Sequence, residues 1–360
     1  MQHSKANTNR AMLLLCLVLA AGFFPFTPAL ADEESPATGQ FGSSAPPQVD
    51  AINITAVADG GIPASLNPAQ EYDISVTVSD ADGIGQLEKL TVKLWYDPSG
   101  TAFTSEAFSS QGIFDPQTLM TVEWTRADNS VYVPANGSWR AYGLSLPTSG
   151  QLANPGYTSH TFYFRIKIGK VAQETTGGKW QVAAKLSDSV PYSDYDYYQA
   201  GGQAGLPMNW YGEVSLAGSD FIDWGYIANG LRAGQSGSIA AVTVSGDGVY
   251  FLSNGDFQQM VKASTTWYKV GDASETVQLS ADATESNTFA LRVSNKKAAD
   301  LSAAIVLPAD GSYATIDASG QATGESGIYE KNYHIWLALS PEVSANGLYR
   351  GSITFSIANR

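Results

Sequence analysis

Two aspartates separated by one residue are the pair in this sequence best suited to bind a cation. Asp80 and Asp82 lie in the segment DADG, where the glycine lets the chain turn. Two carboxylates at this spacing in a turn can meet one hard cation such as calcium. The alternative is a turn in which the aspartate side chains accept hydrogen bonds from backbone amides and bind no metal.

The remaining ligands of a helix-loop-helix calcium loop are missing. The fifth position of such a loop would be Ile84 and the twelfth would be Thr91, and neither supplies the oxygen ligand that is needed. A calcium site at the DADG turn therefore requires a distant carboxylate. Asp97 and Asp188 are the candidates.

The residues on either side of this turn predict two β-strands. From Tyr72 to Val78 every second residue is large and apolar, and from Leu87 to Tyr96 a similar alternation returns. Glycines and aspartates over residues 79–85 allow the chain to reverse between them. We expect the two strands to pair antiparallel across the turn.

Short strand-like runs continue to the end of the chain, and no segment of helical length repeats every three to four residues. The sequence predicts an all-β protein with two tandem β-sandwich domains, over residues 48–190 and 211–360. The first domain has predicted strands at 52–57, 72–78, 87–96, 118–125, 131–133, 138–146, 160–168 and 180–186. The second has predicted strands at 213–216, 221–227, 238–244, 249–252, 265–270, 276–279, 288–293, 303–307, 333–339 and 351–357.

Two segments of the first half, TVSDADGIGQLEKLTVKLWYD and GGKWQVAAKLSDS, resemble immunoglobulin-like or cadherin-like sandwich modules of bacterial and archaeal surface proteins. Two segments of the second half, FIDWGYIANGLRAGQSGSIAAVTVS and YHIWLALSPEVSANGLYRGSITFSI, resemble parts of β-sandwich domains. The last of these looks like the closing hairpin of such a module. The resemblance implies an Ig-like architecture for each half and names no ligand.

An aromatic segment, residues 191–210, separates the two predicted domains. Its glycines and proline are typical of a linker, whereas its rings are more numerous than a flexible linker needs. Either the rings pack at a domain interface or they form an exposed surface on which a sugar or partner protein stacks. The residues of this predicted aromatic surface are Tyr192, Tyr195, Tyr197, Tyr198 and Trp210.

The N-terminus has the features of a secretory signal. Lys5 and Arg10 precede an apolar run, and Ala29-Leu30-Ala31 supplies the small residues that a signal peptidase needs. We expect residues 1–31 to be cleaved, residues 32–47 to form a flexible leader, and the mature chain to be extracellular or at the cell surface, without a transmembrane anchor. The single cysteine lies in the signal, so the mature chain has neither disulfides nor a thiolate site.

The charge balance excludes nucleic acid as an expected partner. The full chain has 20 basic and 34 acidic residues, and its only basic cluster is the pair Lys296 and Lys297. An acidic surface either keeps the protein soluble or binds a divalent cation such as calcium.

No catalytic motif is present, so we expect the protein not to be an enzyme. His160 and His334 both lie in strand-like runs, and neither a GxSxG nor an HExxH motif occurs. A glycosidase pair of carboxylates has no sequence signature, and Glu123 and Glu213 would be its first candidates.

These observations favour a secreted prokaryotic surface or extracellular-matrix protein with a structural or adhesive role. Its expected partners are other surface proteins, itself or a glycan. The alternative is a carbohydrate-binding or carbohydrate-active extracellular protein. Asn53 and Asn136 match the acceptor pattern for N-glycosylation, whose use depends on the host.

Overall fold

The computed structural model describes most of the chain after the predicted signal and leader. The described residues are 45–101, 103–134, 137–190, 192–200, 203–217, 222–230, 242–243, 248–296, 300–344 and 346–360. The predicted signal peptide, residues 1–31, and all but the last three residues of the predicted leader lie outside these ranges.

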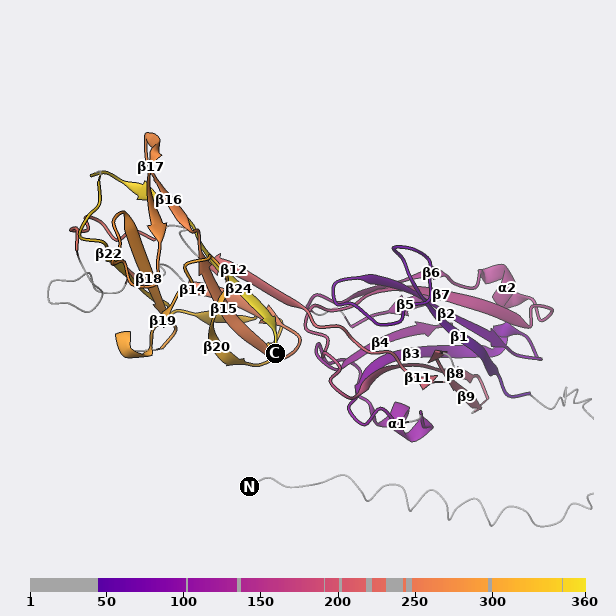
Figure 1. The fold of residues 1–360 in the computed structure, drawn as a ribbon. Coiled ribbons are helices and arrows are strands. Elements are labelled where there is room, and N and C mark those ends of the chain that lie inside the picture. Colours follow the sequence, from indigo (N-terminus) through magenta and orange to yellow (C-terminus); the bar gives the residue numbers. More distant parts are fainter. Residues whose placement is uncertain are drawn as a thin grey trace, which may run out of the picture. The chain divides into compact units, whose positions relative to one another are not determined.

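The described chain is all-β, as predicted (Figure 1). Its N-terminal half contains two antiparallel sheets. One has the order β1-β2-β7-β6, with β1 Gln48–Ala56, β2 Glu71–Ser79, β7 Ser159–Lys167 and β6 Arg140–Ser145. The other has the order β5-β4-β3-β8-β9, with β5 Ser130–Tyr132, β4 Leu119–Thr125, β3 Leu87–Asp97, β8 Lys179–Asp188 and β9 Ser193–Tyr197.

Both sheets of the N-terminal half contribute to one hydrophobic core, in the manner of a β-sandwich. Along β2 the alternate residues Tyr72, Ile74, Val76 and Val78 are buried, while the residues between them are partly exposed. They join Val92 and other residues of the second sheet in one buried cluster, which we call the first core. The period-two pattern of the sequence thus selects the face that is buried.

The expected pairing of the strands around the DADG turn is wrong. β2 pairs with β1 and β7, whereas β3 pairs with β4 and β8, so the turn carries the chain from one sheet to the other. Two strands joined by a turn longer than a tight hairpin can bury their apolar faces against each other across the core instead of hydrogen-bonding edge to edge.

Helical segments in the described chain are short. They are the 3-10 helices η1 (Ile84–Gln86) and η2 (Leu301–Ala303), and the α-helices α1 (Ser105–Ser110) and α2 (Ser149–Ala153). Thr104 and Thr148 cap the two α-helices through their side-chain oxygens. None of the helices in the described ranges has the length and apolar character needed to cross a membrane.

Much of the segment assigned to a linker contributes to the N-terminal half. Its residues 193–197 form β9, which pairs with β8, and Leu206 and Met208 belong to the first core. A second short ladder joins β10 (Gln199–Ala200) to β11 (Gln203–Ala204). The alternation Ser-Asp-Tyr-Asp-Tyr explains the strand, because its tyrosines share one face.

The C-terminal half contains three sheets. One has the order β12-β14-β21, with β12 Gly212–Ala217, β14 Gly248–Ser253 and β21 Ile328–Glu330. A second has the order β20-β15-β24, with β20 Ala314–Gly320, β15 Phe257–Ala263 and β24 Ile353–Asn359. The third has the order β13-β22-β18-β17-β16-β23, with β13 Val242–Thr243, β22 His334–Leu339, β18 Thr288–Ser294, β17 Asp272–Leu279, β16 Thr266–Lys269 and β23 Tyr349–Arg350; β19 Ile305–Val306 also pairs with β18.

These strands enclose a separate buried cluster, the second core, which shares no residue with the first. The predicted closing hairpin does not form, because β22 pairs with β18 while β24 pairs with β15. Of the predicted strand over residues 221–227, the described part, residues 222–227, is not strand, and no β-ladder includes it.

Candidate functional site

The DADG turn and the end of β8 bring two buried carboxylates together. Asp80 is 2% exposed and Asp188 is 8% exposed. Asp80 Oδ1 accepts a hydrogen bond from the Asp82 amide at 2.8 Å, and Asp188 Oδ1 accepts one from the Tyr192 amide at 3.4 Å. The second oxygen of each carboxylate, Oδ2, is buried and has no hydrogen-bond partner in the described part of the chain.

Backbone hydrogen bonds hold both aspartates in place. The Asp80 amide donates to the Thr158 carbonyl at 2.9 Å, directly after β2 ends. Asp188 is paired with Leu87 at the start of β3, and the next residue, Ser189, donates its amide to the Gln86 carbonyl at 3.0 Å. The turn before β3 is thereby joined to the end of β8.

Gly83 is required by the shape of this turn. Its φ is +102°, a region that L-residues with side chains rarely adopt, and an added Cβ would meet the Pro155 backbone at 3.0 Å. Gly83 is therefore needed for the backbone conformation of the turn, whereas the Asp80 side chain is buried in the protein.

The electrostatics of the site oppose two ionised carboxylates. Burial raises the pKa of Asp80, and the charges of Asp82 and Asp188 raise this pKa further, against the hydrogen bond from the Asp82 amide, which lowers it. Neither Asp80 nor Asp188 forms an ion pair with another described residue. The site has a deficit of positive charge.

The other two aspartates that the sequence proposed as ligands are engaged elsewhere. Asp82 is exposed, and its Oδ2 accepts a hydrogen bond from the Ala45 amide at 2.7 Å. Asp97 accepts hydrogen bonds from the amides of Ser99 and Thr101, which lowers its pKa against the effect of burial. Within the described ranges no group of three or more His, Cys, Asp or Glu side chains is arranged to hold a metal.

The predicted aromatic surface is divided between different environments. Tyr195 and Tyr197 are half-buried and contact the rings of Phe108 and Phe103, with centroid separations of 5.6 and 4.9 Å. Tyr198 belongs to the first core, and Trp210 packs against the second core. Tyr192 is 43% exposed. Most of these rings therefore pack within the protein.

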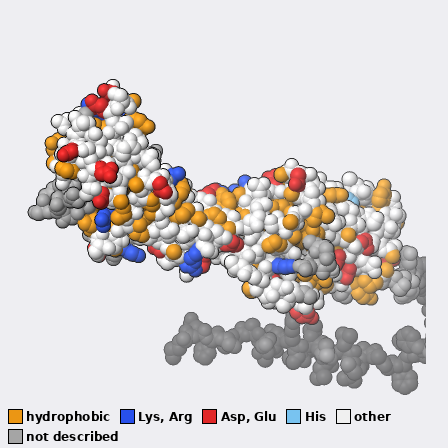
Figure 2. Space-filling view, viewed as in Figure 1, with side chains coloured by type: hydrophobic (Ala, Val, Ile, Leu, Met, Phe, Trp, Pro, Cys, Tyr) orange, Lys and Arg blue, Asp and Glu red, His pale blue; other side chains and the backbone are white. Residues whose placement is uncertain are grey.

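Three large side chains are exposed on β6, which is the edge strand of its sheet, and on the neighbouring strand β7. The sequence did not indicate them. Tyr142, Leu144 and Tyr163 are 46%, 47% and 43% exposed. Leu144 is the extra residue of a bulge between the pairs Gly143–Phe164 and Ser145–Tyr163, so it lies beside Tyr163. We call these three residues the β6 patch. Hydrophobic side chains also reach the surface elsewhere in both halves of the chain, as Figure 2 shows.

The two carboxylates considered for catalysis form ion pairs, whereas the Nε2 atoms of His160 and His334 are buried without a hydrogen-bond partner in the described part of the chain. Glu123 forms an ion pair with Lys89 at 2.6 Å, and Glu213 forms one with Lys170 at 2.7 Å and accepts a hydrogen bond from the Tyr211 hydroxyl. Burial lowers the pKa of His160, which favours its neutral form. These residues do not come together in one acid–base site.

Of the two candidate glycosylation sites, only Asn53 lies within the described residues. Asn53 is exposed on β1, and Asn136 lies outside the described residues.

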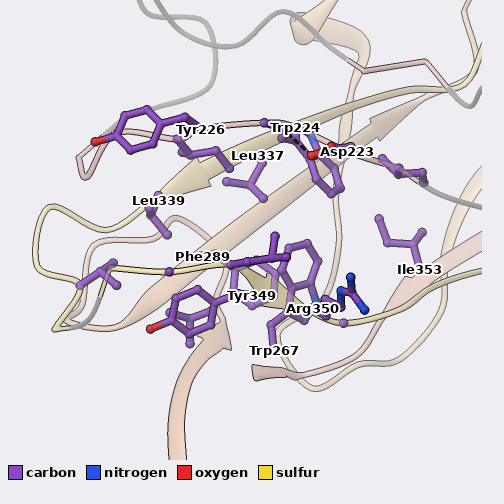
Figure 3. Close-up of a pocket in the computed structure, with 18 of the residues that line it drawn as sticks. Asp223, Trp224, Tyr226, Trp267, Phe289, Leu337, Leu339, Tyr349, Arg350 and Ile353 are labelled. Carbon is purple, nitrogen blue, oxygen red and sulfur yellow. Dashed lines mark hydrogen bonds between the residues drawn. The ribbon is translucent and has the colours of Figure 1, made fainter. Parts of the chain in front are cut away.

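The C-terminal half contains a cavity of about 480 Å³ at one side of the second core. Its walls are mainly apolar and come from β12, β16, β17, β18, β22, β23 and β24, together with the segment 222–229, Val343 and the residues 346–348 and 351–352. Figure 3 shows Asp223, Trp224 and Tyr226 on one side of this cavity and Phe289, Tyr349 and Arg350 on the other.

Aromatic rings and a few polar groups line this cavity. Trp267 lies between Trp224 and Phe289, with ring centroids 5.7 and 4.4 Å away. The Trp224 indole donates to the Ile335 carbonyl at 3.3 Å, whereas the buried Trp267 Nε1 has no partner among the described residues. Tyr226 is 91% exposed at the rim.

No protein-family model matches this chain, and a comparison with curated proteins gives no match.

Proposed function

We propose that this chain is a secreted structural or adhesion protein of a prokaryotic cell surface or extracellular matrix. Its two halves act as tandem Ig-like sandwich domains, and its work is done through protein–protein or protein–glycan contacts. Support comes from the signal-like N-terminus, the acidic composition and an all-β fold in which the candidate catalytic carboxylates, Glu123 and Glu213, form ion pairs.

The observation that favours a protein contact most directly is the β6 patch. Tyr142, Leu144 and Tyr163 place two tyrosines and a leucine on one exposed face of an edge strand and its neighbour. Tyrosine is enriched at protein interfaces because it combines a large contact area with few rotatable bonds. The outer edge of β6 forms no ladder with another described strand, so it can also accept a strand from a partner. We assign this surface to a second copy of the chain.

The test is self-association of the purified mature chain, measured by sedimentation and by aggregation of beads coated with it. We expect concentration-dependent dimers and clustered beads, with both weakened at least tenfold by Tyr142→Ser combined with Tyr163→Ser. Tyr268→Ser is the matched control, because Tyr268 is 51% exposed on β16 in the other half. A chain that stays monomeric and leaves the beads dispersed would show that the contact between copies does not exist.

A carbohydrate-binding role is the second candidate, and the cavity of the C-terminal half favours it. Sugar rings stack on aromatic faces and take hydrogen bonds from polar groups at a rim, and the cavity offers Trp224, Trp267 and Tyr226 beside Asp223 and Arg350. A glycan array probed with the chain and with Trp224→Ala is the test. Binding that survives this change, or that is lost only with Tyr195, Tyr197 and Tyr198 replaced by alanine, would place the glycan elsewhere.

A further inference from the structure

We propose that Asp80 and Asp188 together bind one calcium ion, which links the β2–β3 turn to the end of β8. The two residues are 108 positions apart in the sequence and lie at the ends of strands that belong to different sheets. The inference does not depend on the adhesive function proposed above.

Each of the two aspartates has one buried carboxylate oxygen without a partner in the described part of the chain. Oδ2 of Asp80 and Oδ2 of Asp188 are both removed from solvent, and neither accepts a hydrogen bond from a described residue. A buried carboxylate oxygen without a partner is costly, and a second such oxygen nearby adds repulsion. The pairing of Leu87 with Asp188 and the hydrogen bond from the Ser189 amide to the Gln86 carbonyl place the end of β8 beside the turn that contains Asp80, so both oxygens belong to one junction.

The negative charge at this junction also favours a divalent cation over a proton. One proton would neutralise only one of the two carboxylates, and the carboxylate of Asp82 adds further negative charge beside them. A divalent cation neutralises the pair at once. No lysine or arginine in the described part of the chain forms an ion pair with Asp80 or Asp188.

The ligand chemistry selects calcium among the divalent cations. The unpartnered atoms are all carboxylate oxygens, whereas zinc prefers nitrogen and sulfur ligands. Calcium accepts six to eight oxygen ligands in flexible geometry, so two carboxylates, turn carbonyls and water can complete the shell. Magnesium demands a tighter octahedron and retains its water more strongly.

The position of the ion has a structural consequence for the start of β1. Asp82 of the same turn holds the Ala45 amide, and Asp194, just after the β8–β9 turn, holds the Val49 amide at 2.8 Å. A cation that joins these two turns would therefore also fix the place where the chain enters the first sheet.

The experiment is calcium titration of the purified mature chain after treatment with EDTA. We expect isothermal titration calorimetry to show one site with a Kd on the order of 0.1–1 mM, as in extracellular modules. We expect 10 mM calcium chloride to raise the Tm by about 3–8 °C, because the ion binds only the folded state. Magnesium chloride at the same concentration should raise it less.

The variants Asp80→Asn and Asp188→Asn should each abolish both the heat of binding and the rise in Tm. Asp97→Asn is the matched control: Asp97 also accepts hydrogen bonds in a turn, yet it lies outside this pair, so its variant should keep the full response. The absence of calcium binding to the unmutated chain would overturn the proposal, and this measurement does not depend on any variant folding. A calcium response retained in both Asp80→Asn and Asp188→Asn would overturn it as well.

Discussion

The two halves of the chain have hydrophobic cores that depart from complete packing in opposite ways. The first core is closed around its large rings, including Trp124, Phe164 and Trp180, but at its edge two buried carboxylates have no positive partner. The second core has its large rings partly turned toward a cavity of about 480 Å³. The first half has no positive charge beside its buried carboxylates, and the second half has unfilled space beside its aromatic rings.

The difference indicates what each half can bind. Buried carboxylate oxygens require a hard cation or a proton, and apolar filling would not satisfy them. An apolar cavity with aromatic walls gains little from an ion, whereas a ring or an aliphatic group would restore the missing van der Waals contacts. The first half therefore has a pair of buried carboxylates, where we propose a cation, and the second half has an apolar cavity.

The largest expected effect comes from removing a matched ring from each core. Phe164 on β7 is fully buried, and Phe289 on β18 is 1% exposed but lines the cavity. Phe164→Ala should lower the unfolding free energy by about 3–5 kcal/mol, and Phe289→Ala should cost about 1–2 kcal/mol less, because part of its ring has no neighbour to lose. Chemical denaturation followed by tryptophan fluorescence measures both.

Equal costs for the two phenylalanines would mean that Phe289 is packed as fully as Phe164 in solution. The cavity would then be filled by the protein itself, and the contrast between the two cores would disappear.

The strands β2 and β15 show when alternation in the sequence reveals a strand and when it does not. β2 was recognised because its buried residues are Tyr, Ile, Val and Val. β15 was missed, since Gln259 occupies one of its buried positions. The Gln259 side chain is satisfied by Asn295, at 3.1 Å, and by the Tyr333 hydroxyl, and these partners are distant in the sequence.

Alternation also predicts a buried face without predicting a partner strand. In segment 222–227, Ile222, Trp224 and Ile227 are less exposed than their neighbours, yet no strand pairs with this segment. For the same reason the sequence could not show that β2 and β3 join different sheets, because pairing depends on strands that arrive much later in the chain.

The candidate ionic site was predicted in part. Asp80 follows from the local DADG pattern, but the choice between Asp97 and Asp188 depends on the pairing of β3 with β8. Asp97 could have been set aside, because Asp97-Pro98-Ser99 is itself a turn sequence whose hydrogen bonds occupy the carboxylate. The cavity had no sequence signal, since its walls come from seven strands and from loops spread over the second half of the chain.

The next effect in size is the pH dependence of stability without calcium. The pKa of Asp80 is raised in the folded state by burial and by the charges of Asp82 and Asp188, so the folded protein binds this proton more tightly than the unfolded chain does. The contribution of the Asp80 carboxyl to the unfolding free energy is fully present below about pH 4, the ordinary pKa range of an aspartate. It is lost as the pH rises through the higher pKa of the folded state. In EDTA, therefore, the stability of the unmutated chain relative to Asp80→Asn should fall as the pH rises from 4 to 7.

Calcium should remove most of that relative loss, because the ion stabilises the charged carboxylates. Comparison with Asp80→Asn at each pH cancels the opposite contribution of Asp97, Asp272 and Asp317, whose pKa values are lowered. A difference between the two proteins that does not change with pH in EDTA would show that Asp80 is not destabilised by its surroundings.

The smallest expected effect is the stabilisation gained by filling the cavity. Val343 lines the cavity from a loop and is only partly buried, so a larger side chain there can turn inward without strain on a strand. Val343→Phe should raise the unfolding free energy by about 0.5–2 kcal/mol, the usual range for cavity filling. A matched increase in the closed core, Val76→Phe, should instead lower it by about 1–3 kcal/mol, because no space is available there. The opposite signs of these two substitutions, measured in the same denaturation experiment, are what a closed first core and an open second core require. If Val343→Phe destabilises the chain, the cavity is already occupied by protein atoms. The proposed carbohydrate-binding role would then have no site, and the two cores would no longer differ in packing.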